Sequence, residues 1–252
     1  MLKTVILAAG KGTRMESDLP KVVHEANGKM MVAGVIDAAV EAGASKLCLV
    51  VGHQGALVQE KVNKVYFGEQ DFTITFATQT EQLGTGHAVK CAKDFIGDEG
   101  DVLVLCGDTP LIQGDTLKKL VDTHRREGNG ATVLSAVLPD ATGYGRIIRG
   151  ADGALERIVE QKDATEQERA VREINSGMYV FSALALSESL DMLTNDNVQG
   201  EYYLTDTLEL IKNRIGKRVN AVVTENLDDI RGVNTKAQLA EAEEILKQRK
   251  AK

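Results

Sequence analysis

Strand-like and helix-like patterns alternate along the first half of the chain, and this alternation limits the fold more than any other feature. Apolar, β-branched runs predict strands at 4–8, 46–51, 72–78 and 101–106. Apolar residues at helical spacing predict helices at 31–42, 56–65, 86–96 and 115–127. This order is typical of an α/β fold, a Rossmann-like open and mainly parallel sheet with helices on both faces.

The second half is less regular. We expect strands at 130–138, 178–181 and 218–223, a hairpin over 144–149 and 155–161, and helices over 184–193 and 202–215. Thr235 and Gln238 match a capping box, which predicts a lone amphipathic helix over about 235–248. That helix either packs on its own domain or forms an arm that leads away from it. We therefore expect one large domain over 1–230 and a C-terminal helical arm over 231–252.

Composition excludes several classes of protein. The net charge of -7 argues against a general nucleic-acid binder, which needs a broad basic face. No apolar run approaches a membrane span, and the N-terminal run is too short for a signal peptide. The three cysteines (Cys48, Cys91 and Cys106) lack metal spacing, and two of them lie in strand-like runs. We expect Cys48 and Cys106 to be buried thiols and the protein to be cytoplasmic.

Ligands of open parallel sheets bind beyond the carboxyl ends of the strands. The first strand is followed by the sequence LAAGKGTRMESDLPK, residues 7–21. It is not a Walker A loop, and Met15 stands where a dinucleotide fingerprint needs its third glycine. The backbone N–H groups near Gly10 and Gly12, the Arg14 guanidinium and the Lys21 ammonium suit a phosphate. The alternative is a surface turn whose charges are solvated.

Two further loops carry polar groups to the same edge. Asp108 ends an apolar strand, where a carboxylate needs a cation or another partner. Together with substrate phosphates it suits Mg²⁺, unless it is only a turn or helix-capping residue. Gln79, Gln82, Gly84 and Thr85 form an amide-rich loop that suits a nucleobase edge, or simply a polar loop.

The histidines suggest no catalytic or metal role. His24, His53 and His124 have no partners at catalytic or metal spacing, so we interpret them as structural or surface residues. His87 begins a helix, is compatible with a solvent-facing position, and receives no role. No motif marks a nucleophile.

Later candidates have weaker patterns. Gly145 lies in a glycine-rich turn that admits a ring close to the backbone, and Glu160 follows the predicted hairpin, where a solvated turn is the alternative. Asn175 interrupts an apolar strand, which is as compatible with a bulge as with a site. Asn234 suits a helix cap.

Taken together, LAAGKGTRM, SDLPK, EQLGTGHA, GDTPL, TGYGRI, VEQKDA, INSGMYVF, GEYYLTD and GVN resemble the motifs of bacterial N-acetylglucosamine-1-phosphate uridyltransferases. The resemblance covers residues 1 to about 250. It implies transfer of UMP from UTP to N-acetylglucosamine 1-phosphate, with pyrophosphate as the second product and Mg²⁺ as the cofactor.

The resemblance also implies roles for single residues. Arg14, Lys21 and Asp108 would be catalytic, and Asp108 and Asn234 would bind Mg²⁺; Asn234 would also contact substrate. The nucleotide phosphates would contact Leu7, Ala8, Ala9, Gly10, Gly12, Thr13, Arg14 and Lys21. Gln79, Gly84 and Thr85 would contact uracil, and Gly145, Glu160 and Asn175 would contact the N-acetylglucosamine moiety. Cys106 and Gly107 precede Asp108. Cys106 stands where some members carry tyrosine, so only a backbone role is carried over there.

The family usually continues into a left-handed β-helix that acetylates glucosamine 1-phosphate and trimerises. Residues 1–252 contain no hexapeptide repeat. We therefore expect this domain to be absent, no acetyltransferase activity, and a trimer only where that domain is present. Three alternatives stay open: another nucleotide and sugar 1-phosphate pair, a non-catalytic nucleotide sensor, and a scaffold that uses the terminal helix.

Overall fold

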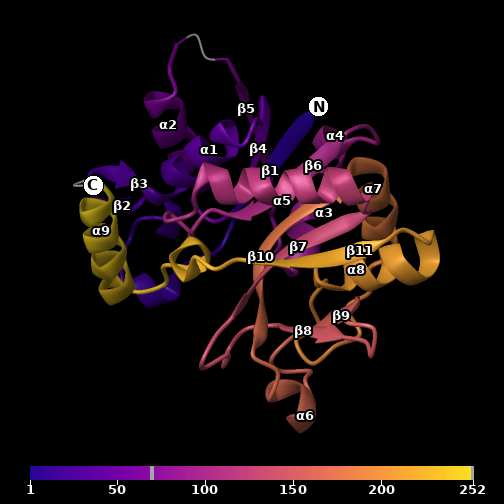
Figure 1. Ribbon diagram of the computed structural model, residues 1–252. Coiled ribbons are helices and arrows are strands. Elements are labelled where there is room, and N and C mark those ends of the chain that lie inside the picture. The colour runs from indigo at the N-terminus through magenta and orange to yellow at the C-terminus, as the bar shows by residue number, and fades with distance from the viewer. Residues whose placement is uncertain (69–70, 251–252) are drawn as a thin grey trace.

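One twisted, mainly parallel sheet runs through the molecule (Figure 1). The computed structural model describes residues 1–68 and 71–250. Seven strands of the described residues follow the order β11-β7-β10-β6-β1-β4-β5. Their bounds are β1 Leu2–Ala8, β4 Lys46–Val51, β5 Thr73–Thr78, β6 Asp101–Cys106, β7 Ala131–Val137, β10 Glu173–Ser182 and β11 Val219–Val223. Along this path only β10 is antiparallel to its neighbours β6 and β7.

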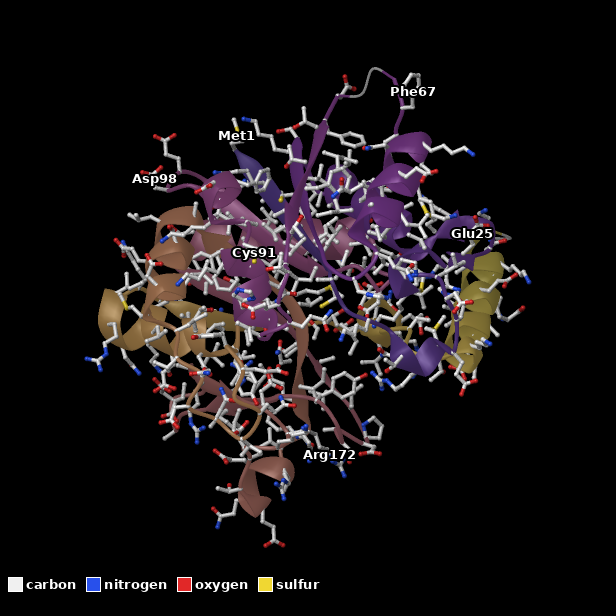
Figure 2. All side chains as sticks on the ribbon, turned by 180° about the vertical axis from the view of Figure 1, so that it is seen from behind. Met1, Glu25, Phe67, Cys91, Asp98 and Arg172 are labelled. Carbon is white, nitrogen blue, oxygen red and sulfur yellow. The ribbon has the colours of Figure 1, made fainter. Side chains whose placement is uncertain are left out.

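Helices cover both faces of the sheet, because its central strands are apolar on both sides. The helices α1 Met31–Glu41, α2 Gly55–Val65 and α5 Gly114–Glu127 pack on one face. The helices α3 Thr85–Lys90, α4 Lys93–Ile96, α7 Ala183–Met192 and α8 Asp206–Leu210 pack on the other. Figure 2 looks at this second face, where Cys91 follows α3. The predicted α/β class and helix placement are confirmed.

Three predicted elements differ most from the observed ones in their extent. The helix expected over 86–96 divides into α3 and α4, because its first part ends with a tight turn in which the Ala92 N–H donates to the Val89 carbonyl. The strand expected over 178–181 is the longer β10, interrupted by a bulge between Asn175 and Tyr179. The helix expected from residue 202 begins at Asp206 and ends in a π-helical turn over Ile211–Ile215.

A separate hairpin extends from the sheet. Strands β8 Arg146–Arg149 and β9 Leu155–Val159 pair with each other, and Arg146 pairs with Ile174 of β10. The short helix α6 Glu166–Arg169 follows the hairpin, and both lie at the lower end of Figure 1. This arrangement brings Gly145, which precedes β8, beside Asn175 in the polar interruption of β10.

The smaller elements complete the path. Strands β2 Glu25–Ala26 and β3 Lys29–Met30 form a two-stranded ribbon, and 3₁₀ turns occupy Thr13–Met15, Lys21–Val23 and Leu227–Ile230. Within the described part of the chain, no helix has the length and apolarity needed to cross a membrane.

Helix α9 Lys236–Lys250 packs on the domain from which it emerges. Ala242 is buried in a cluster with Met31 and Leu111, and the Arg249 guanidinium donates to the Leu111 carbonyl at 2.6 Å. Thr235 accepts from the Gln238 N–H at 3.2 Å, as predicted. The Gln238 side chain accepts from the Asn234 N–H at 2.8 Å, one residue earlier than in a capping box. Of the two arrangements considered, packing on the same domain is the observed one; the boundary at 230 stays a prediction.

Candidate active site

A cleft of about 330 Å³ lies at the carboxyl ends of β1, β5 and β6. Parallel strands end at a common edge, so three loops far apart in sequence meet there. Ten of the predicted site residues line this cleft: Leu7, Ala8, Ala9, Gly10, Lys21, Gln79, Gly84, Thr85, Cys106 and Asp108. Among the other predicted residues, Gly12, Thr13, Arg14, Gly107, Gly145, Glu160, Asn175 and Asn234 lie outside its lining.

The loop after β1 is folded tightly against itself. Met15 is fully buried and anchors it, whereas Lys11, Thr13 and Arg14 are exposed. Gly12 has φ +60°, and a Cβ there would lie 2.6 Å from the Lys21 Cβ. Only glycine permits both this backbone conformation and this approach. Gly12 therefore contributes by letting Lys21 reach the cleft. Thr13 is exposed and lies outside the lining of the cleft.

Four side chains form what we call the polar cluster: Arg14, Lys21, Asp108 and Asn234. The Lys21 ammonium pairs with the Asp108 carboxylate and donates to Asn234 Oδ1 at 2.9 Å. The Arg14 guanidinium donates to the same oxygen at 3.0 Å. The Lys21 and Asp108 side chains are 13% and 22% exposed, so water screens their attraction less than that of a surface pair.

Backbone pairing explains how Asn234 reaches this cluster. The Val233 N–H donates to the Asp108 carbonyl at 2.8 Å, which fixes the segment before α9 beside the end of β6. The predicted helix cap at Asn234 is wrong, because Thr235 accepts from the Gln238 N–H at the start of α9 and the Asn234 side chain is turned to Lys21 and Arg14. The interpretation of Asp108 as a mere turn residue is not needed, because the carboxylate is paired with a cation.

The donor set fits a divalent metal ion of the magnesium type. Asp108 and Asn234 direct oxygen atoms at one cation, the Lys21 ammonium, so the two oxygens already converge on one point. Mg²⁺ is usually held by one or two protein oxygens together with substrate phosphates. Residues 1–68 and 71–250 contain no group of three or more His, Cys, Asp and Glu side chains that could form a complete protein cage.

The amide-rich loop forms another wall of the cleft. Gln82 donates to the Ala9 carbonyl at 2.7 Å and thereby connects this loop to the loop after β1. Gly84 has φ +106°, and a Cβ there would lie 2.6 Å from the Tyr202 carbonyl. Thr85 accepts from the Leu204 N–H at 3.1 Å. The polar side chains of this loop are therefore held in place and are not merely solvated.

His87 differs from its sequence-based interpretation. It is half-buried, and its Nδ1 lies 3.2 Å from Gln79 Nε2. The periodicity around residue 87 could not reveal this contact, because Gln79 precedes the helix. His124 is a structural residue, as predicted: it is buried and lies 2.9 Å from the Thr132 hydroxyl.

The three residues assigned to the sugar form a second group. The Asn175 N–H donates to the Gly145 carbonyl at 2.9 Å, and a Cβ at Gly145 would lie 3.4 Å from the Glu160 carboxylate. Glu160 accepts from the Thr205 hydroxyl at 3.2 Å. Burial raises the pKa of the Glu160 carboxyl, despite that hydrogen bond. Gly145, Glu160 and Asn175 are thus brought together, as the resemblance implies.

Cys106 connects the cleft to this second group. Its thiol donates to the Gly177 carbonyl at 3.5 Å, and Gly177 follows Asn175 in the bulge of β10. Burial, together with the Asp108 charge, raises the pKa of the Cys106 thiol to about 12. A thiolate nucleophile is therefore not available there. Gly107 has a backbone role, since its N–H donates to the Leu7 carbonyl at 2.9 Å.

Several residues at the site have no role that was predicted from the sequence. Val22, Ala88 and Glu201 also line the cleft, and Thr205 contacts Glu160. Glu201 and Thr205 lie in the GEYYLTD motif, which contributed to the resemblance without yielding a site residue. The GEYYLTD motif was therefore the signal in the sequence from which these two residues could have been predicted.

Comparisons with known proteins agree with this arrangement. A sequence model described as nucleotidyl transferase matches residues 3–248. The chain is 51% identical over 248 residues to the bifunctional protein GlmU of Caldanaerobacter subterraneus subsp. tengcongensis. It is 48% identical over 247 residues to that of Clostridioides difficile. Each alignment covers 98% of this chain and 52% of the relative, so the chain spans about half the length of these relatives.

Solved structures show the same fold. UDP-glucose pyrophosphorylase in complex with UDP-glucose has a TM-score of 0.79 at 19% identity, with 98% of each chain covered. The apo form of a UDP-glucose pyrophosphorylase has a TM-score of 0.80 at 19% identity, with 99% of this chain and 100% of that chain covered. The predicted resemblance is confirmed: with a match over nearly all of its length, this chain belongs to the nucleotidyl transferase family.

Proposed function

We propose that the protein transfers UMP from UTP to N-acetylglucosamine 1-phosphate, giving UDP-N-acetylglucosamine and pyrophosphate. The observation that carries this proposal is that Lys21 and Asp108 of the polar cluster line one cleft together with the glycine-rich loop and the amide-rich loop. Cys106, in the same lining, contacts the Gly177 carbonyl, two residues after Asn175. Such a cleft offers cations for a triphosphate, an amide for a base and a polar group for a sugar. The similarity to bifunctional GlmU proteins supports the choice of substrates.

The nucleophile needs no activation by the protein. An oxygen of the sugar 1-phosphate is already anionic, and it would attack the α-phosphorus in line. A new oxygen–phosphorus bond forms, the bond to the bridging oxygen breaks, and pyrophosphate leaves with that electron pair. The protonated Cys106 thiol has no part in this step. Catalysis then rests on orientation of the two phosphates and on stabilisation of charge.

Arg14 and Lys21 would stabilise the charge that develops on the leaving pyrophosphate. Lys21 lines the cleft, Arg14 lies outside its lining, and both cations contact Asn234 Oδ1. Gly12 allows the loop to hold Lys21 there. A Cβ added at Gly10 would have no other atom within 4 Å, so the backbone there borders open space. The backbone N–H groups near Gly10 would therefore be accessible to phosphate oxygens.

Asp108 and Asn234 would hold Mg²⁺. When bound, the ion supplies Lewis-acid neutralisation of phosphate oxygens. The two protein oxygens converge on a cation already, which supports their assignment as ligands. Gln79, Gly84 and Thr85 would contact the uracil, and Gly145, Glu160 and Asn175 the N-acetylglucosamine moiety.

A substrate panel tests the proposal directly. Pyrophosphate release is measured with UTP, CTP, ATP and GTP, each against N-acetylglucosamine 1-phosphate and glucose 1-phosphate, with and without Mg²⁺. We expect UTP with N-acetylglucosamine 1-phosphate to give the highest kcat/KM. Asp108→Asn should abolish Mg²⁺-dependent turnover, whereas Asp115→Asn, at an exposed position of α5, should not.

Other outcomes of the panel would replace the proposal. Higher kcat/KM with another pair would identify a different nucleotidyl transferase reaction. Calorimetric binding of UTP without turnover of any pair would favour a nucleotide sensor. Unchanged Mg²⁺ dependence in Asp108→Asn would contradict the ligand assignment.

A further inference from the structure

The Gln79 side chain is held in one orientation at the wall of the cleft. Its backbone N–H donates to the Val51 carbonyl at 2.8 Å, which continues the pairing of β5 with β4 by one residue. The residue is 5% exposed and lines the cleft. Its amide therefore has few alternative positions, and the question is which end of the amide faces the cleft.

Two contacts determine the direction of this amide. Gln79 Nε2 donates to the Gly84 carbonyl at 3.1 Å and lies 3.2 Å from His87 Nδ1. A backbone carbonyl can only accept, so the NH₂ end must be the end at Gly84. One hydrogen of Gln79 Nε2 is donated to the Gly84 carbonyl, so the second is directed to His87 Nδ1. Nδ1 then accepts this hydrogen bond, which requires that Nδ1 itself carries no hydrogen.

The position of His87 is itself restrained. The Gly86 N–H donates to the Tyr202 carbonyl at 2.8 Å, and the His87 and Tyr202 rings lie 6.4 Å apart between centroids. The ring lines a separate cavity with Tyr202 and Cys91. Nε2 has no protein partner among the residues that the structure describes, and the side chain is half-buried. The ring hydrogen can therefore be carried by Nε2 while Nδ1 accepts.

The orientation of the Nε2 end of the Gln79 amide determines where its carbonyl oxygen, Oε1, points. Both hydrogens of Gln79 Nε2 are directed at acceptors of the protein, so the end of the amide that can face the cleft is Gln79 Oε1. No donor among the described residues contacts this oxygen. An acceptor at this point pairs with a base that presents a ring N–H, as uracil does at N3. Cytosine presents an acceptor at N3, and the two lone pairs would repel each other.

We propose that His87 is a positioning residue that fixes the Gln79 amide with its carbonyl oxygen toward the cleft and so selects uracil over cytosine. This inference rests on the proposed function, in which Gln79 contacts the base. Guanine also presents a ring N–H beside an oxygen, at N1 and O6. Discrimination against guanine therefore comes from its size and not from His87.

The test compares two variants of similar shape. His87→Leu removes the acceptor, and His87→Asn keeps an acceptor oxygen near the position of Nδ1. For each protein, kcat and KM are measured with UTP, CTP and GTP at saturating N-acetylglucosamine 1-phosphate and Mg²⁺. In His87→Leu we expect the ratio of kcat/KM for UTP over CTP to fall by about tenfold, because one of two contacts on the amide is lost. The effect on UTP should appear in KM, with kcat within about twofold.

The remaining expectations separate orientation from general damage. His87→Asn should retain the UTP over CTP ratio within about threefold, and the ratio of UTP over GTP should change little in either variant. A ratio of UTP over CTP unchanged in His87→Leu would overturn the inference. An equal loss in both variants, with GTP use rising in parallel, would assign His87 a structural role instead.

A second measurement covers the case in which His87→Leu does not fold. The triphosphate of N3-methyluridine lacks the N3–H, and the wild-type protein should use it at least about 10²-fold less well than UTP. Equal use of both would exclude an acceptor at this point. Failure of the proposed function has a different signature, because the wild-type protein would then not turn over UTP. In that case the affinities of the same variants for UTP and CTP are measured by calorimetry, and the ratio of these affinities replaces the ratio of kcat/KM values.

Discussion

Gly12 offers a sharp test of how the glycine-rich loop positions Lys21. In Gly12→Ala the new Cβ would lie 2.6 Å from the Lys21 Cβ, 3.4 Å from its Cγ and 3.5 Å from its Cα. Carbon atoms in ordinary contact lie about 3.5–4.0 Å apart, so the loop and Lys21 must separate by about 1 Å. The backbone at φ +60° adds a strain of about 1 kcal/mol for alanine.

These two effects have different readouts. A loss of about 1 kcal/mol lowers the Tm of a chain of this size by roughly 2–4 °C. A displacement of about 1 Å in a charged group that orients phosphates can lower the rate by about 10²-fold. We therefore expect a small fall in Tm in a thermal melt and a large fall in kcat/KM in the pyrophosphate-release assay.

Gly128→Ala is the matched control. Gly128 follows the last residue of α5 and has φ +63°, and a Cβ added there would meet no atom within 4 Å. Alanine at this position therefore meets the same backbone strain without a clash. We expect a similar fall in Tm and normal turnover. If Gly12→Ala keeps turnover within about twofold of Gly128→Ala, the close approach of the loop to Lys21 has no part in catalysis.

Three further predictions concern charge and packing. Arg14→Ala should lower turnover by about 10²-fold or more, because a charge contact beside Asn234 is lost; near-normal pyrophosphate release would remove Arg14 from its proposed role. Burial, with neighbouring carboxylates, raises the pKa of Asp206 from 3.8 to about 6, so the folded state loses stability as pH rises from about 4 to 6. Asp206→Asn should raise Tm by a few degrees at pH 7.5 and not near pH 4, while Glu188→Gln, at an exposed position, should change Tm at neither pH. Ala242→Glu places a charge in the cluster under α9 and should lower Tm by at least about 5 °C, whereas Ala240→Glu, on the more accessible side of α9, should not.

Local patterns in the sequence were sufficient for the fold class. The alternation of apolar runs with helical periodicity predicted the parallel sheet and the helices on both faces, because burial of a strand or helix face leaves its period in the sequence. The rule that ligands bind at strand ends then predicted the edge at which Lys21, Gln79 and Asp108 meet. The motifs shared with a known family selected the sugar-binding candidates, which periodicity alone left open.

The boundaries of elements were less predictable. The division between α3 and α4, the start of α8 and the bulge in β10 depend on hydrogen bonds made within and around each segment. A window of sequence contains no information on contacts with distant residues. The same reason kept the packing of α9 on Met31 and Leu111 undecided until the fold was known.

The amino-acid sequence alone therefore determined the architecture, the position of the cleft and most of the groups around it. Tertiary structure alone decided how those groups are oriented. Lys21 and Asn234 are 213 positions apart, and the pairing of Val233 with Asp108 holds the amide beside the ammonium. His87 likewise contacts Gln79 because a loop between strand and helix turns back on itself. Orientation depends on distances in space, which residue spacing does not encode.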